Sequence, residues 1–151
     1  MSLEVSRTIQ ASADSVWATL MDVERWPQWT ASMTSLERLD AGPLRVGSRV
    51  RIRQPSVPAM VWTVTDLQPL RGFTWSATAA GVTTLASHSL GPSADGKVSV
   101  RLAIQRRGLL APLLDLLTAS LTRRYVGLEA DGLKRACEAS QAATPHTPPT
   151  T

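Results

Sequence analysis

The stretch from Leu109 to about Ala139 constrains the fold more than any other part of the chain. It opens with seven leucines in thirteen residues and keeps apolar residues at steps of three or four: Leu110, Leu114, Leu117, Leu121, Tyr125 and Leu128. This spacing predicts one long α-helix with these residues on a single apolar side. Pro112 fits if the helix begins near Leu109, because a residue of the first turn has no intrahelical amide bond to lose.

Such a helix needs a large apolar partner. Leu109, Leu113 and Leu116 widen the apolar side in the first turns, and a leucine fully withdrawn from water contributes about 1.5–3 kcal/mol. Asp115 and Glu129 are expected on other sides of the helix. The rest of the chain must therefore supply the surface that covers the leucines.

The totals indicate one domain with its own core, because 151 residues are enough to bury one. The sequence has neither a run of about twenty apolar residues nor the basic and then apolar start of a signal peptide. We therefore expect a cytoplasmic protein without stable membrane insertion. Cys137 is the single cysteine, which excludes an internal disulfide and a zinc–cysteine cluster. It is interpreted as a small residue near a helix end, with a nucleophilic role as the less favoured alternative.

The net charge of +4 does not by itself indicate a nucleic-acid partner. The arginines are dispersed, acidic residues lie between them, and no nucleic-acid-binding motif is present. His88 and His146 are the two histidines, and His146 lies in the terminal segment. One usable histidine does not make a metal site of a known type, so no metal and no cofactor are expected.

The residues before the long helix alternate between apolar and polar, which is typical of half-buried strands. Strands are predicted over 3–9, 33–38, 48–53, 59–67, 73–79, 82–90 and 97–106. Ser12 is a candidate N-cap for a helix that carries Val16 and Leu20. Asp22 is a candidate cap for a second short helix over 23–26, which Pro27 would end.

The order of elements predicts the architecture. Short connections between successive strands favour an antiparallel meander, and alternation gives the sheet one wet and one apolar face. We predict an α+β fold in which a twisted seven-stranded antiparallel sheet wraps around the long C-terminal helix. The domain is expected to span residues 1–140. Residues 141–151 contain too little apolar surface to order themselves and are predicted to be a disordered tail.

Several short segments resemble one known family. The segment from Ala13 to Asp22, followed by Trp26-Pro27-Gln28-Trp29, resembles the opening of the polyketide cyclase/dehydrase-like proteins of the START-like (SRPBCC, Bet v 1-like) superfamily. Further similar segments are Gly47 at the start of a strand, Val64-Thr65-Asp66-Leu67-Gln68-Pro69, and His88-Ser89-Leu90-Gly91-Pro92 before Asp95-Gly96. The resemblance covers about residues 3 to 138. It implies a helix-grip fold, in which the sheet and the long helix enclose an elongated apolar cavity for a lipid, sterol or polyketide.

If such a cavity exists, nine residues are candidates for contact with its ligand: Trp29, Ile52, Trp62, Trp75, His88, Leu114, Leu117, Leu121 and Tyr125. Flat indole rings suit a ring system, and Trp29 follows Pro27 in a loop expected near the cavity mouth. Core packing is the alternative for the tryptophans and for Tyr125.

Two of these residues are candidates for proton transfer. His88 shares a strand face with Ala86 and Leu90, so its imidazole either exchanges a proton with a ligand or is held by backbone or water within the sheet. The Tyr125 hydroxyl needs a partner and could orient a ligand carbonyl. Arg51, Arg53 and Asp66 are expected on the wet face or at a strand end; the alternative is an inward position, where an arginine would bind a carboxylate.

Three functions fit these observations. The first is a binder of a small hydrophobic molecule, lipid or polyketide-like, between sheet and helix. The second is a polyketide cyclase, aromatase or dehydratase that uses His88 and Tyr125 to move protons. The third is a protein-interaction module without a ligand, and a homodimer is compatible with each of the three. The motifs mark helix packing and turns, and none of them requires catalysis.

Overall fold

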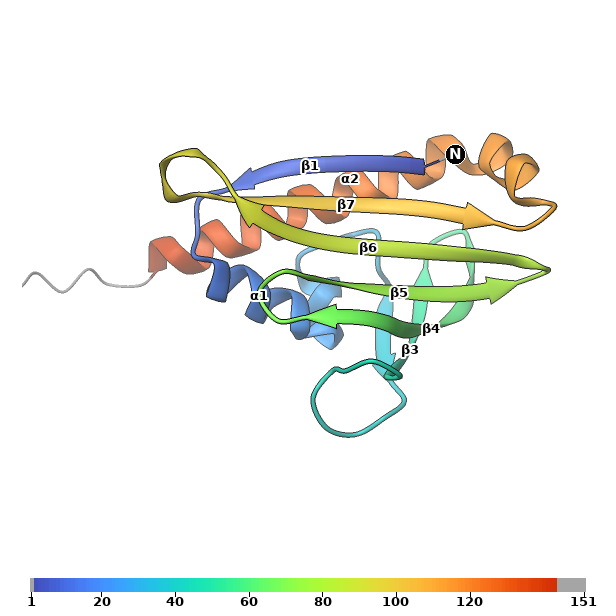
Figure 1. Ribbon diagram of the computed structural model, residues 1–151, viewed down its shortest axis with the longest axis horizontal. Helices are drawn as coiled ribbons and strands as arrows, with labels where there is room; N and C mark the ends of the chain where they lie inside the picture. The colour runs from blue at the N-terminus through green and yellow to red at the C-terminus, as the bar shows by residue number, and fades with distance from the viewer. Residues whose placement is uncertain (1, 144–151) are drawn as a thin grey trace, which may run out of the picture.

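A computed structural model describes residues 2–143 as a long antiparallel sheet with one long helix lying across a single face of it (Figure 1). The strands are β1 (Ser2–Ile9), β2 (Ser35–Arg38), β3 (Arg49–Gln54), β4 (Val57–Gln68), β5 (Gly72–Ala79), β6 (Val82–Pro92) and β7 (Val98–Arg107). The helices are α1 (Ala13–Met21) and α2 (Ala111–Ala143), with short 3-10 helices η1 (Val23–Gln28) and η2 (Ala94–Gly96).

The sheet has the order β1-β7-β6-β5-β4-β3-β2, and each neighbouring pair is antiparallel. Each strand from β2 to β6 pairs with the next along the chain, and β1 closes the far edge beside β7. Register shifts interrupt the pairing near Gln54 and near Asp66, and such bulges increase the local bend and twist of a sheet. In Figure 1 the sheet faces the viewer and α2 runs behind β7 and β1. The predicted α+β helix-grip class is confirmed.

Most predicted elements are found within a few residues of their expected bounds. Ser12 caps α1, since its hydroxyl accepts a hydrogen bond from the Ser15 amide at 3.1 Å. Two boundaries differ. The short helix η1 continues through Pro27 to Gln28, and β4 begins at Val57, so that Pro58 lies inside the strand and only a tight turn remains where a loop was expected.

The apolar side predicted for the long helix is wrong in its N-terminal half. Leu110 is 55% exposed and Leu117 is 73% exposed, and Leu109, Leu113 and Leu116 also face outward. The buried side of α2 consists of small, polar and apolar residues: Ala111, Asp115, Val126, Glu129, Ala130, Leu133 and Cys137. The helix is thus rotated from the predicted orientation, because Asp115 and Glu129 find partners on the sheet that leucines could not provide.

Small residues let the C-terminal half of α2 approach the rest of the domain closely. A Cβ added at Gly132 would lie 2.0 Å from the carbonyl oxygen of Trp29, whereas one added at Gly127 would meet nothing within 4 Å. This half of the helix covers the core formed by α1, η1 and the inner face of the sheet, where Val16, Leu20, Trp26 and Leu133 are buried.

Helix α2 ends at Ala143, a few residues beyond the predicted end near Ala139. The predicted tail over residues 141–151, with His146, lies mostly outside the described residues. Within residues 2–143 no helix combines the length and apolar character needed to cross a bilayer.

The close approach at Gly132 predicts opposite effects for two alanine substitutions in one helix. Gly132→Ala is expected to lower the free energy of unfolding by about 1–3 kcal/mol, because backbone must move to admit the methyl group. Gly127→Ala, the matched control, is expected to leave it unchanged or raise it by up to about 1 kcal/mol, since alanine favours a helix interior over glycine. Urea unfolding followed by circular dichroism measures both; a Gly132→Ala protein as stable as the parent would contradict the packing described.

Candidate ligand-binding site

A cavity of about 440 Å³ lies between the sheet and α2. Side chains from five strands form its wall on the sheet side: Ile52, Met60, Trp62, Trp75, Ala86, His88, Leu102 and Ile104. The facing wall belongs to α2 and consists of Leu114, Thr118, Leu121, Thr122, Tyr125, Val126 and Glu129. Its volume falls in the range typical of sites for small molecules.

The cavity exists because the two ends of α2 pack differently. At the C-terminal end, Gly132 brings the helix against Trp29. At the N-terminal end Thr118 and Thr122 are short, and together with Leu114 and Leu121 they do not fill the space above the sheet. The turn between β3 and β4 and the turn between β5 and β6 complete the lining through Ser56, Val57, Ala79 and Ala80.

An aromatic cluster forms the inner end of this space. Trp26 lies 5.3 Å from Trp75 between ring centroids, and Phe73 stacks on the His88 imidazole at 4.3 Å with an interplanar angle of 6°. The indole Nε1 of Trp26 donates to the Leu20 carbonyl at 3.2 Å, so its polar atom is satisfied. Offset and edge contacts of this kind fix ring orientations, and they hold His88 in one position.

The central polar feature is a buried pair between β6 and α2. His88 Nε2 lies 2.9 Å from Glu129 Oε1, and both side chains are buried. With an ionised carboxylate, Nε2 carries the hydrogen, which leaves Nδ1 of the neutral ring as an acceptor. Nδ1 is buried and has no hydrogen-bond partner among the described residues. The pair therefore leaves one buried polar atom of the imidazole without a partner, packed beside the aromatic cluster at the edge of the cavity.

A second buried pair ties β7 to the first turns of α2. Arg106 donates from one terminal nitrogen to Asp115 at 2.8 Å and from the other to the Thr122 hydroxyl at 3.0 Å. Arg106 and Thr122 both line the cavity. Because each charge has a close partner, the burial of this arginine and this aspartate is compensated.

The structure brings together seven of the nine predicted contact residues: Ile52, Trp62, Trp75, His88, Leu114, Leu121 and Tyr125 all line the cavity. Leu117 does not, because it lies on the outer side of α2. Trp29 does not line it either; it packs on Trp26 at 5.4 Å and against α2 at Gly132, away from the mouth where a gate was expected.

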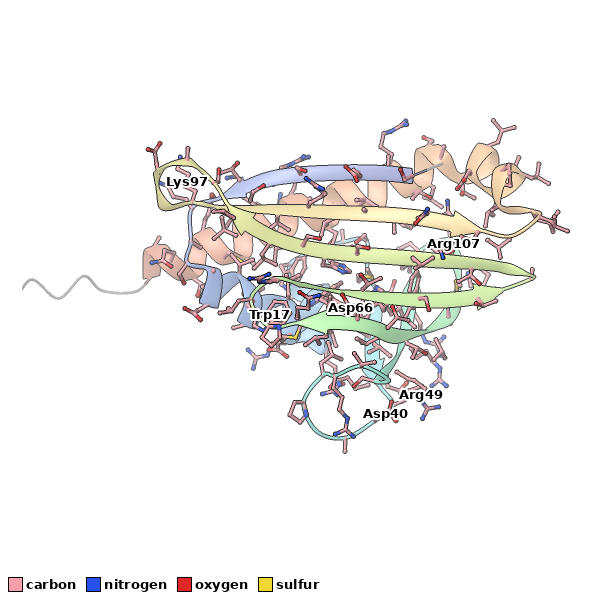
Figure 2. The ribbon with its side chains drawn as sticks, in the orientation of Figure 1. Trp17, Asp40, Arg49, Asp66, Lys97 and Arg107 are labelled. Atoms are coloured by element: carbon pink, nitrogen blue, oxygen red, sulfur yellow. The ribbon has the colours of Figure 1, made fainter. Side chains whose placement is uncertain are left out.

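The hydroxyl of Tyr125 is already engaged, since it donates to the carbonyl of Pro55 in the turn between β3 and β4. Arg51 pairs with Glu37 at 3.2 Å, Arg53 is exposed, and Asp66 points outward on the open face of the sheet (Figure 2). The alternative of an inward arginine or acid is therefore wrong. Cys137 is buried, and burial raises the pKa of its thiol, which opposes a nucleophilic role.

One charge pair on the outer surface, Asp40 with Arg49, joins the loop before β3 to the start of that strand. The carboxyl of Asp40 accepts from the Arg49 side chain and backbone amide, and this guanidinium holds the pKa of Asp40 below its ordinary value. Figure 2 shows both residues at the lower edge of the molecule, away from α2.

Sequence reasoning missed Glu129, Asp115 and Arg106. Asp115, Thr122 and Glu129 follow one another at intervals of seven, so they share one side of a helix. That regular polar spacing was the available signal, and it marks the side that faces the sheet.

The fold and the cavity define the class of protein as helix-grip, with an enclosed site between sheet and C-terminal helix. Residues 1–138 match the family described as polyketide cyclase / dehydrase and lipid transport, and the chain belongs to this family. No match is found among curated protein sequences.

Solved structures agree on the fold. A hypothetical protein from Helicobacter pylori is similar with a TM-score of 0.75 and 14% identity, over 90% of this chain and 86% of that one. A START superfamily protein from Mycobacterium smegmatis is similar with a TM-score of 0.71 and 15% identity, and the alignment covers 92% of this chain and 98% of that one. The di-domain aromatase/cyclase BexL of the BE-7585A biosynthetic pathway is similar with a TM-score of 0.69 and 16% identity. The alignment covers 96% of this chain and 48% of BexL.

The buried pair predicts a non-additive stability effect. Glu129→Ala leaves the buried His88 N–H without its partner and is expected to lower the free energy of unfolding by about 1–3 kcal/mol. Replacing both groups with apolar ones, as in His88→Phe with Glu129→Leu, removes the polar desolvation as well and is expected to cost less than Glu129→Ala alone. Urea titrations of the single and double variants complete the cycle; strictly additive losses would contradict a direct pair.

Proposed function

We propose that this protein binds a small hydrophobic molecule in the cavity, with the polar end of the ligand at His88. One observation carries the proposal: an apolar cavity of about 440 Å³ whose wall contains a single imidazole, fixed by Glu129 and with Nδ1 unpaired. Apolar lining supplies affinity through burial, and a few placed polar groups supply orientation. The family description, which includes lipid transport, supports the same function.

The proposed ligand is elongated or polycyclic and carries a hydroxyl or carbonyl group. Trp62 and Trp75 offer flat apolar contact from the sheet, and Leu121 belongs to the opposite wall on α2. A ligand hydroxyl would donate to Nδ1 of His88 after a small movement of the rings packed on it, and this would satisfy an atom that is otherwise buried without a partner. Tyr125 is available only as an acceptor, because its proton is donated to Pro55.

A fluorescent fatty acid and an aromatic hydroxyketone, titrated against tryptophan emission, test the binding. We expect saturable, one-to-one quenching by at least one of them, since two indoles line the cavity. Leu121→Trp fills the cavity and is expected to weaken binding by about tenfold, or 1.4 kcal/mol. Leu116→Trp, on the outer side of the same helix, is the control and should bind normally. Absence of saturable quenching by both probes would overturn the proposal.

A second candidate is catalysis of ring closure and water loss on a polyketide-like substrate. The specific observation in its favour is the His88–Glu129 pair in an apolar, water-poor site, where a positioned imidazole can accept and return a proton. Nδ1 would take a proton from a carbon between two carbonyls; the new carbanion attacks a ketone carbon, the alkoxide is protonated, and water then leaves. Similarity to the fold of the aromatase/cyclase BexL supports the shape of the site but assigns no residue.

A synthetic β-polyketone thioester whose closure gives an aromatic chromophore tests this candidate. His88→Phe is expected to abolish enzyme-dependent closure, and Glu129→Gln to reduce kcat by about 10²-fold or more, since the imidazole loses its orienting carboxylate. Tyr125→Phe, which lacks only the hydroxyl bound to Pro55, should retain most of the rate. Equal rates with and without the parent protein would contradict the candidate while leaving ligand binding untouched.

A further inference from the structure

Five exposed leucines gather where β7 joins α2. Leu109 is fully exposed, Leu116 is 77% and Leu113 is 53% exposed, and Leu110 and Leu117 are also open to solvent. Leu113, Leu116 and Leu117 are separated by three and four residues, so they lie side by side on the helix, and the other two lie in the turn before it. Single exposed leucines need no explanation, but a contiguous group marks an interaction surface. We call these five residues the leucine patch.

Positive charge alone borders the leucine patch. Arg123 and Arg124 follow Leu116 and Leu117 by seven residues, which places them on the same side about 10 Å further along the helix. Arg107 ends β7 just before the patch (Figure 2). These three arginines are exposed and form no ion pair within residues 2–143. Asp115 is the single acidic residue between Lys97 and Leu128, and it is buried against Arg106.

We propose that the leucine patch docks this protein on the surface of a bilayer that contains anionic lipids. The leucine patch and the three arginines beside it match the acyl boundary and the headgroup layer of a bilayer. The leucines enter the acyl boundary, and the arginines reach the headgroup phosphates. Both contributions are needed, because short apolar segments or few basic residues alone bind membranes weakly. The docking is reversible and lies in the interface, unlike a membrane span.

A second copy of the chain is a poorer occupant of the same surface. A two-fold contact through the leucine patch would bring Arg123 and Arg124 of one copy close to the same residues of the other if the helices run parallel, and close to the end of the patch that follows Arg107 if they run antiparallel. Over the described stretch from Lys97 to Leu128 there is no exposed acid to compensate that repulsion, and like charges across an interface suppress association.

The leucine patch lies next to the cavity, so docking would serve the transfer of a ligand between the bilayer and the cavity. Leu114, Thr118 and Leu121 line the cavity from the same turns of α2 that carry the patch on their outer side. Docking would therefore hold this wall of the cavity close to the acyl boundary, so that an apolar ligand has a short path between the bilayer and the cavity. This consequence rests on the proposed function, whereas the docking itself does not.

Vesicle flotation with the full chain tests the proposal. We expect binding to phosphatidylcholine vesicles that contain phosphatidylglycerol, and much weaker binding to phosphatidylcholine alone. Leu116→Ser with Leu117→Ser should reduce the affinity at least tenfold, and Arg123→Gln with Arg124→Gln about tenfold together with most of its salt dependence. The control, Val46→Ser with Val61→Ser, removes two exposed apolar residues outside α2 and should bind like the parent.

Three further measurements separate the outcomes. The leucine variant should keep the parent's urea midpoint and its affinity for the fluorescent fatty acid in solution, so a failed ligand site and a failed docking surface remain distinguishable. Binding of the parent to neither vesicle, or equal binding by the leucine variant, would overturn the proposal. A dimer in analytical ultracentrifugation that Leu116→Ser with Leu117→Ser converts to monomer would also overturn it, in favour of a self-interface.

Discussion

Two buried polar pairs determine how α2 lies on the sheet. Glu129 meets His88 of β6, and Asp115 meets Arg106 of β7, each at hydrogen-bond distance. Turning the helix away from His88 and Arg106 would leave the carboxylates of Glu129 and Asp115 in the interior without these partners, which is far more costly than leaving one leucine exposed to water. These pairs, about four helical turns apart, fix the rotation of the helix about its axis. This rotation determines which leucines of α2 face the sheet and which face solvent.

The cavity follows from this rotation and from the size of the inward residues. Near Gly132 the helix backbone touches that of Trp29, and large side chains such as Trp26 and Leu133 fill the core. Toward the N-terminus the inward positions hold Ala111, Thr118 and Thr122, which are too short to reach the strands. A sheet bent by two bulges cannot follow the helix closely at both ends. Space therefore remains above Trp62, Trp75 and Ile104, and the apolar wall of the sheet becomes the wall of a site.

The sequence predicted the sheet much better than it predicted the orientation of the helix. Strands with period-two alternation, such as the one containing Val98, Val100 and Leu102, have one possible inner face once the apolar residues are counted. The helix had two candidate sides. Leucine spacing favoured one, and the spacing of Asp115, Thr122 and Glu129 marked the other; the second was correct because those residues have partners far away in sequence. Hydrophobic periodicity cannot detect a polar residue whose partner lies on another strand.

The site was predictable to the same extent and for the same reason. Strand residues such as Ile52, Trp75 and His88 were placed correctly, since the face of a strand follows from alternation. Leu117 was not, because its place depended on the helix rotation. The family resemblance implied a cavity, and the leucine-rich helix was expected to cover the apolar face of the sheet. The structure has a cavity, which Leu114 and Leu121 line together with short residues, whereas the other five leucines between residues 109 and 121 lie outside. Burying both kinds of residue together would have filled the site. Because short residues such as Thr118 and Thr122 face the sheet and five leucines face outward, space for a ligand remains. The same arrangement leaves an apolar surface on the outer side of the helix, which a bilayer can cover.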